Sequence, residues 1–273
     1  MIDWQNGARI RFSADGKSLE GLCIGTAPAD APTIIMLHEG LGCIDMWKDF
    51  PQEIADETGY GVFVYSRAGY GQSDPADLPR PVDYMTREAI NVLPQVLDAV
   101  RLQRGILLGH SDGASIAAIY SGSVSDMRIR GLILMAPHFF TEPDGLASIR
   151  RMKDAYDQGD LREKLAKYHK DPGNAFRGWN DVWLKPEFAG WNIGDSIDHL
   201  RIPVLAFQGS DDEYGTRVQL DEVDERTYSP AETTILEDCG HSPHRDQPEK
   251  ALALIADFAA RLQRLEMEKV TVA

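Results

Sequence analysis

Cysteine is scarce in this sequence, and the positions of the few cysteines exclude two common uses of the residue. The 273 residues include only Cys23, Cys43 and Cys239, and no two of them are spaced as Cys-x-x-Cys. An odd and scattered set predicts neither a disulfide framework nor a zinc site. The chain also lacks a Gly-x-Gly-x-x-Gly or Gly-x-x-x-x-Gly-Lys motif at the start of a strand–helix unit. We therefore expect no metal and no cofactor.

Basic residues are few relative to acidic ones. The chain has 28 Lys and Arg against 43 Asp and Glu, which gives a formal charge of −15. The acidic residues are spread along the whole chain, so the surface should repel nucleic acid and anionic lipid. The same balance also serves simply to keep a protein in solution. The expected partner is a small-molecule substrate, with a second copy of the chain in a homo-oligomer as a further possibility.

Long apolar runs are absent as well. The longest stretches, such as 131–136, are far too short to cross a bilayer. The first residues, Met1 to Trp4, do not combine a basic segment with an apolar run, so no signal peptide is evident. These features predict a soluble, cytoplasmic protein.

Short apolar runs alternate with helical patterns along most of the chain. Runs of this kind read as strands buried on both faces, and such strands separated by helices form a parallel sheet. We predict an α/β fold with a mostly parallel central sheet and helices on both faces. The expected strands are 9–12, 19–25, 33–37, 62–65, 106–108, 132–135, 204–207 and 233–236, and the expected helices are 85–102, kinked at Pro94, 114–125, 215–228 and 248–265.

One segment interrupts this alternation. The stretch between the strands at 132–135 and 204–207 is much longer than a plain crossover needs. Its first part, 146–168, is helical in pattern, and the remainder is rich in Trp, Gly, Asn and Pro. We predict a core made of 1–137 and 201–273, with a mainly helical cap at 138–200 inserted over the carboxyl edge of the sheet.

The pentapeptide Gly109-His110-Ser111-Asp112-Gly113 fits the pattern Gly-x-Ser-x-Gly. The pattern alone is weak, but here it follows a predicted strand directly and opens a predicted helix. A strand–turn–helix of this kind lifts a serine above the sheet at the positive end of a helix, where an oxyanion is stabilised. Ser111 is therefore the candidate nucleophile.

With this motif in its context, the chain resembles the α/β-hydrolase superfamily from about Ile34 to the C-terminal helix. The resemblance implies a base and an acid in the order Ser, acid, His. The family pattern Gly-x-x-Asp selects Asp212 as the acid, with the adjacent Asp211 as the alternative. The Gly-His pair before the last helix selects His241 as the base, while His244 is expected to cap that helix or face solvent.

The resemblance also implies an oxyanion hole, made by the backbone N–H groups of Gly40 and Asp112. Family members carry His-Gly-x where this chain has His38-Glu39-Gly40. Glu39 departs from that pattern, so the N–H of Leu41 is the alternative to that of Gly40. Arg67, in a segment that resembles the family's Arg-Gly-x-Gly-x-Ser, is expected to bond loop carbonyls and not to take part in catalysis.

Several side chains near these motifs are candidates for substrate binding. For the two histidines beside the predicted strands, a hydrogen bond to the backbone is the alternative role, and for the cap aromatics the alternative is packing of the cap on the core. His241, His244 and Asp246 lie close in sequence, but no further ligands accompany them, so they predict no metal site. The candidates are His38, Leu41, His110, His138, Trp179 and Trp183.

These features together favour a serine hydrolase that cleaves a carboxylic ester, thioester or lactone through an acyl-enzyme. Two alternatives stay open. The first is cleavage of a carbon–carbon bond in an aromatic ring-cleavage product, which relatives with the same triad and cap perform. The second is a non-catalytic small-molecule receptor on the same fold. Ser111 at the nucleophile position argues against a haloalkane dehalogenase, because that subgroup has Asp there.

Overall fold

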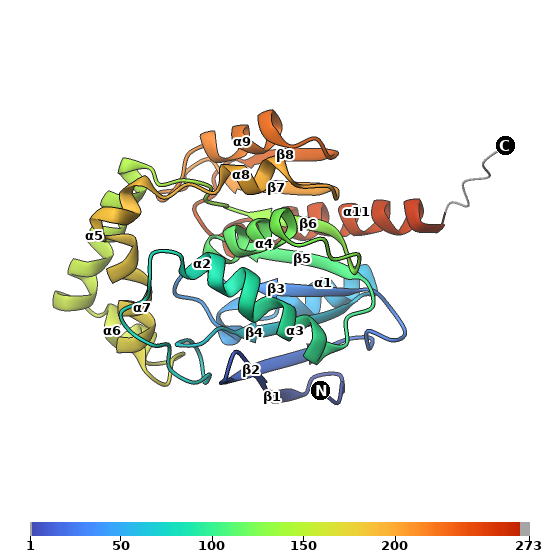
Figure 1. Ribbon diagram of the computed structural model, residues 1–273, viewed down its shortest axis with the longest axis horizontal. Coiled ribbons are helices and arrows are strands. Elements are labelled where there is room, and N and C mark those ends of the chain that lie inside the picture. Colours follow the sequence, from blue (N-terminus) through green and yellow to red (C-terminus); the bar gives the residue numbers. More distant parts are fainter. Residues whose placement is uncertain (1, 268–273) are drawn as a thin grey trace.

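A single mixed sheet organises the molecule, as the computed structural model in Figure 1 shows. The structure describes residues 2–267, so residue 1 and residues 268–273 of the predicted core lie outside the described residues. The strand order is β1-β2-β4-β3-β5-β6-β7-β8; β2 is antiparallel to both of its neighbours, β1 and β4, and all the other pairs are parallel. The strands are β1 (Arg9–Ala14), β2 (Lys17–Ile24), β3 (Thr33–Leu37), β4 (Gly61–Ser66), β5 (Gly105–His110), β6 (Ile129–Met135), β7 (Val204–Gly209) and β8 (Ala231–Leu236).

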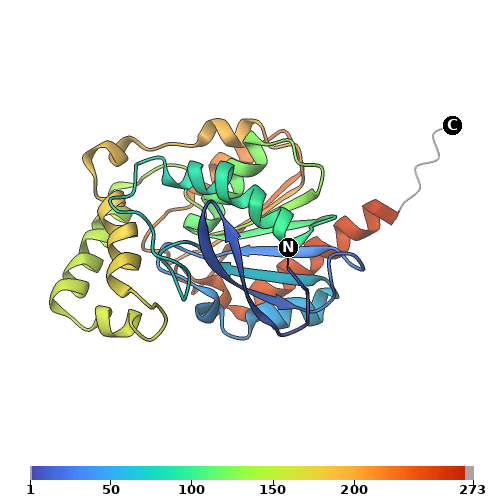
Figure 2. The same ribbon diagram turned by 60° about the horizontal axis from the view of Figure 1, so that its bottom comes forward.

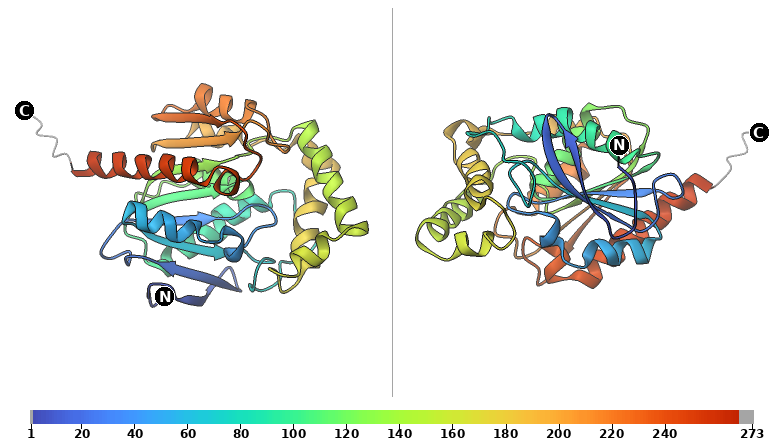
Figure 3. Two further views of the ribbon diagram at one scale, coloured as in Figure 1. Left: turned by 180° about the vertical axis from the view of Figure 1, so that it is seen from behind. Right: turned by 90° about the horizontal axis from the view of Figure 1, so that it is seen from below.

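Helices cover both faces of this sheet, as predicted. From the front, Figure 1 shows α2 to α4 over one face, and the reverse view in Figure 3 shows α1 and α11 over the other. Each face has its own apolar core, because the strands carry buried side chains on both sides. These helices are α1 (Phe50–Thr58), α2 (Tyr84–Arg87), α3 (Leu93–Val100), α4 (Asp112–Ser123), α8 (Gly194–Asp198), α9 (Val218–Arg226), α10 (Pro243–Asp246) and α11 (Pro248–Met267), with a 3₁₀ turn at Ile44–Trp47.

The predicted α/β fold is confirmed, and the differences lie in a few helices. The helix expected at 85–102 is divided into α2 and α3 by a π-helical turn at Glu88–Val92, directly before Pro94. Proline cannot supply the backbone N–H of a regular helical turn, which accounts for the break. Helix α1 is not predicted from the pattern, although Pro51 in its first turn and Gly59 after its end are ordinary helix boundaries.

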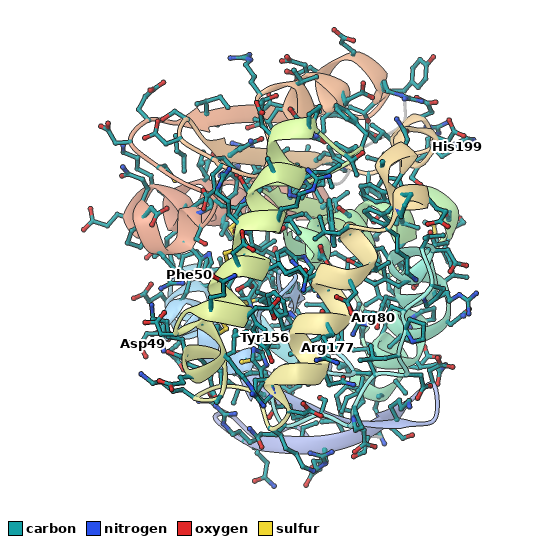
Figure 4. The ribbon with its side chains drawn as sticks, turned by 90° about the vertical axis from the view of Figure 1, so that its left-hand side faces the viewer. Asp49, Phe50, Arg80, Tyr156, Arg177 and His199 are labelled. Atoms are coloured by element: carbon teal, nitrogen blue, oxygen red, sulfur yellow. The ribbon has the colours of Figure 1, made fainter. Side chains whose placement is uncertain are left out.

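The inserted segment lies beyond the carboxyl edge of the sheet, at the left of Figure 1 and again at the left of Figure 2. It contains α5 (Pro143–Gln158), α6 (Leu161–Leu165), α7 (Pro172–Trp183) and a 3₁₀ turn at Pro186–Gly190. Figure 4 looks onto this edge, where α5 and α7 run side by side. The ring of Tyr156 on α5 stacks on Phe176 of α7, with centroids 3.9 Å apart.

The segment leaves and rejoins the core at neighbouring points. Phe140 and Asn192 form an antiparallel bridge, and the Ile193 N–H donates to the Phe139 carbonyl over 2.7 Å. Helix α8, which follows, packs on α4 of the core, where a Cβ on Gly122 would lie only 2.0 Å from the Ser196 carbonyl oxygen. Within the described residues, no helix is long and apolar enough to span a membrane.

Candidate active site

Ser111 lies in the sharp turn between β5 and α4. Its backbone has φ 54° and ψ −119°, a region that residues with a Cβ seldom occupy. The flanking glycines are required by space: a Cβ on Gly109 would lie 2.3 Å from the Gly113 carbonyl oxygen, and one on Gly113 would lie 2.1 Å from that of Leu37. The sequence thus forms the strand–turn–helix that the Gly-x-Ser-x-Gly pattern predicts.

His241 and Asp212 are brought together from the loops that follow β8 and β7. The His241 Nδ1 atom lies 2.9 Å from Asp212 Oδ1 and 2.8 Å from Oδ2. The Asp212 side chain is buried, and its Oδ1 also accepts the Tyr214 N–H over 2.9 Å. This geometry favours Asp212 over Asp211 as the partner of His241, since Asp211 is exposed.

The carboxylate governs the charge of the imidazole. Burial alone would lower the pKa of His241, but the adjacent Asp212 outweighs burial and raises that pKa above its ordinary value of 6.5. Burial in turn favours the neutral form of Asp212, yet His241 outweighs it and holds the pKa of Asp212 below its ordinary value. A neutral His241 therefore keeps its proton on Nδ1, facing Asp212, and leaves Nε2 free to accept one.

Ser111 and His241 line a common cavity of about 250 Å³. Within the described residues the Ser111 hydroxyl makes no hydrogen bond to His241; in catalytic sites such bonds often tighten only when substrate is bound. The floor of the cavity consists of loops that follow β3, β5, β6, β7 and β8, and the roof comes from the inserted segment. The roof residues are Ile149, Met152, Leu161, Leu165, Trp179 and Trp183.

The loop after β3 enters this cavity with Gly40. A Cβ on Gly40 would lie 2.2 Å from Nε1 of Trp179, so the indole of α7 packs directly on the loop. Leu41 also lines the cavity, and Asp112 is the first residue of α4, next to Ser111. Gly40 therefore lines the same cavity as Ser111, and Asp112 follows the serine at the start of α4.

The Asp112 side chain makes an unexpected connection to the cap. Its fully buried carboxylate accepts hydrogen bonds from the Tyr84 hydroxyl and, over 3.2 Å, from Nε1 of Trp183. The guanidinium of Arg67 lies 3.9 Å away. Burial raises the pKa of Asp112, and Arg67 and Tyr84 oppose that effect. Helix α7 is thus tied by a hydrogen bond to the residue that follows Ser111.

Four of the six predicted substrate-binding residues line the cavity: Leu41, His138, Trp179 and Trp183. The buried His38 and His110 do not, which corrects their assignment as substrate contacts. His38 Nε2 accepts the Arg67 N–H over 3.0 Å, and His110 Nε2 lies 2.7 Å from the His241 carbonyl oxygen. Each ring contacts a backbone group, which is the alternative role predicted for these two histidines.

His244 does not face solvent, which is one of the two roles predicted for it. Its ring is buried rather than exposed, and it packs against Trp47 with centroids 4.7 Å apart. Burial, reinforced by the nearby His110, lowers the pKa of His244 to about 3, so the ring is neutral. The sequence gives no signal of this, because the apolar partners Trp47 and Phe50 come from the distant 3₁₀ turn and the start of α1.

Arg67 occupies the structural position predicted for it. Its guanidinium donates to the carbonyl oxygens of His38 and, over 3.1 Å, of Glu39. Tyr84, by contrast, is not predicted, because a tyrosine in a helical pattern carries no mark of a distant carboxylate partner. Across the described residues, no group of His, Cys, Asp or Glu is arranged to hold a metal ion.

Comparisons with known proteins agree with this architecture. The model of the "Alpha/beta hydrolase family" matches residues 34–254 of the chain. A proline iminopeptidase from Lactobacillus delbrueckii subsp. bulgaricus is 23% identical, over 86% of this chain and 92% of that protein.

Solved structures of the same fold are similar over nearly the whole chain. A thermophilic esterase from Thermogutta terrifontis superposes with a TM-score of 0.72 at 18% identity, over 93% of this chain and 99% of that one. The enol-lactonase from Burkholderia xenovorans LB400 also gives 0.72, at 17% identity, over 92% of this chain and 100% of that one. At such identities the likeness establishes the fold alone.

Proposed function

Because the chain belongs to the alpha/beta hydrolase family, we propose that it is a serine hydrolase of small-molecule carboxylic esters, thioesters or lactones. One observation carries the proposal. Ser111, in a strained strand–turn–helix, opens onto a cavity shared with His241, and Asp212 fixes the orientation of that histidine. Nucleophile, base and orienting acid are the parts that acyl transfer needs.

The proposed reaction proceeds in two halves. Ser111 Oγ attacks the carbonyl carbon while His241 Nε2 takes the hydroxyl proton, and the N–H groups of Gly40 and Asp112 stabilise the oxyanion. His241 then returns the proton to the departing alcohol or thiol, which leaves an acyl-enzyme on Ser111. Water, deprotonated by His241, attacks the acyl carbon, and the proton goes back to Ser111 as the acid departs.

The lining of the cavity favours a substrate without an anionic group there. The roof is apolar or aromatic throughout. Of the two lining carboxylates, Glu39 is turned toward His110, and the charge of Glu213 is opposed by that of Arg245. The carboxylate of a ring-cleavage dienoate would lose its hydration under this roof, at a cost in free energy. For this reason we favour ester, thioester or lactone cleavage over carbon–carbon bond cleavage.

The test is a panel of substrates run on the wild type and on Ser111→Ala. The panel contains p-nitrophenyl esters of increasing acyl length, acyl thioesters, lactones, an N-terminal prolyl anilide and a ring-cleavage dienoate. Ser123→Ala, at the exposed far end of α4, is the matched control. We expect turnover of at least one ester, thioester or lactone, a loss of about 10³-fold or more in kcat for Ser111→Ala, and none for the control.

Other outcomes would redirect the proposal. Selective turnover of the dienoate would indicate carbon–carbon bond cleavage, and selective turnover of the prolyl anilide would indicate an aminopeptidase. Measurable binding without any turnover would favour the receptor alternative. Equal activity of Ser111→Ala and wild type would remove Ser111 from the mechanism.

A further inference from the structure

Glu39 is the residue at which the oxyanion loop departs from the family pattern, and its carboxylate has a defined place. Oε2 lies 3.6 Å from Nδ1 of His110, and the side chain is 20% exposed whereas His110 is fully buried. The carboxylate also folds back over its own loop, because a Cβ on Gly42 would lie 2.2 Å from that oxygen. Glu39 therefore faces the end of β5, just before Ser111, and only a small part of its side chain is open to the cavity.

The second nitrogen of His110 faces another oxygen. Its Nε2 lies 2.7 Å from the His241 carbonyl oxygen, and a carbonyl can only accept. A neutral imidazole has one N–H, which satisfies this carbonyl and leaves Nδ1, a buried atom without a hydrogen-bond partner among the described residues, as a lone pair that faces the Glu39 carboxylate. A doubly protonated ring has a donor for each oxygen. The positions of the two acceptors thus favour an imidazolium.

The titratable rings around His110 are those of His241, which must be neutral to act as the base, and of His244. The rings of His241, His244 and Trp47 have centroids 5.2, 5.1 and 6.1 Å from that of His110. His244 is neutral, since burial lowers its pKa to about 3. Burial favours the neutral form of Glu39, yet the adjacent His110 outweighs it and lowers the pKa of Glu39 below its ordinary value. Glu39 is thus the carboxylate that faces the ring.

Three loops meet at this ring. His110 precedes the serine, Glu39 precedes Gly40, and the carbonyl belongs to His241 itself. We propose that Glu39 and a protonated His110 form an ion pair that positions Gly40 and the His241 loop around Ser111. Both are then positioning residues that act through the oxyanion donor and the base. The catalytic consequence rests on the proposed hydrolase function, whereas the ion pair itself does not.

A double-mutant cycle tests the catalytic consequence. We expect Glu39→Gln to lower kcat by about ten- to a hundredfold, less than removal of an oxyanion donor, with KM changed by less than about threefold. Glu39→Asp, which keeps the charge, should retain more activity. Glu39→Gln combined with His110→Gln should lose no more than the worse single variant, because the two residues act as a pair. Losses that multiply would overturn the proposal.

The protonation state supplies a readout that is independent of activity. Histidine side-chain ¹H–¹⁵N correlation spectra at neutral pH should show both His110 nitrogens protonated in the wild type, and one in Glu39→Gln. Glu237→Gln, which removes an exposed carboxylate elsewhere, should leave the His110 signals unchanged. A neutral His110 in the wild type would overturn the pair even in an active hydrolase. A protonated His110 in a protein inactive on every ester would support the pair while rejecting the proposed function.

Discussion

At the scale of single residues, the site depends on a few backbone and side-chain positions held by their neighbours. The left-handed backbone of Ser111 costs about 1–3 kcal/mol in a residue with a Cβ. Its own N–H donates to the Met135 carbonyl over 2.9 Å, and its carbonyl accepts the Ala114 N–H over 2.8 Å. These bonds fix the turn before any substrate arrives, so the orientation of the hydroxyl does not have to be gained on binding.

The pH dependence of activity follows from the charge of His241. The base must be neutral to accept the serine proton, so activity is lost as pH falls through its pKa. Because Asp212 raises that pKa, we expect the midpoint of the kcat/KM profile to lie above 6.5. Asp212→Asn should lower both the activity and this midpoint. A profile that is flat between about pH 6 and 8 would contradict His241 as the base.

The residues of this site could be predicted from the sequence only where a local pattern marks them. Ser111 stands in a five-residue motif, and Asp212 and His241 follow predicted strands. The burial of His244 and the pairing of Glu39 with His110 depend on which loops meet in space, and no spacing in the chain records that. The bond between Tyr84 and Asp112 is of the same kind.

At the scale of elements, the inner strands β3 to β7 were predictable to within a few residues because they are largely apolar and buried on both faces. Helix α7 was not, since Pro172, Gly173 and Gly178 give it a weak helical pattern. It forms because Asp171 caps its N-terminus, accepting the Asn174 N–H over 2.9 Å, and because its aromatic residues pack on the core. Tertiary packing here outweighs intrinsic propensity.

The bond from α7 to the nucleophile turn gives a prediction for this helix. Trp183→Phe keeps an aromatic ring, although a smaller one, and removes the N–H that Asp112 accepts over 3.2 Å and the Tyr84 hydroxyl over 3.0 Å, so a buried carboxylate loses a donor. We expect a loss of about 1–3 kcal/mol in the free energy of unfolding, measured with urea, and a lower kcat.

The matched control for that variant is Trp4→Phe. The Trp4 indole donates over 3.1 Å to the Gly25 carbonyl, a neutral acceptor in a partly exposed place far from the cavity. This change should cost less stability and leave kcat unaltered. If both variants behave alike in kcat, the link between α7 and Asp112 has no role in the reaction.

At the scale of the whole molecule, the sheet holds the loops that carry the proposed triad, and the inserted segment closes the cavity above them. The division of the chain at 138–200 stays a prediction. The bridge between Phe140 and Asn192 suggests a narrower unit, because the chain ends there lie side by side and α8 packs with the core. Segment 142–190 is therefore the part of the chain whose removal should disturb the core least.

Replacing 142–190 by a short Gly-Ser linker tests this division. We expect a core that still unfolds cooperatively in circular dichroism, because the linker joins neighbouring chain ends. KM for the best ester should rise, since the roof of the cavity, including Trp179 and Trp183, is gone. A variant without a cooperative transition would show that the segment is part of a single folding unit.

Covalent capture of the nucleophile tests the central claim most directly. The wild type would be treated with a fluorophosphonate, which phosphonylates activated serines, and then analysed by intact-mass and peptide mass spectrometry. The account predicts one adduct, on the peptide that contains Ser111, formed more slowly in Asp212→Asn and absent in Ser111→Ala. An adduct on another serine, or none in a protein that turns over esters, would contradict the assignment of Ser111 as the nucleophile.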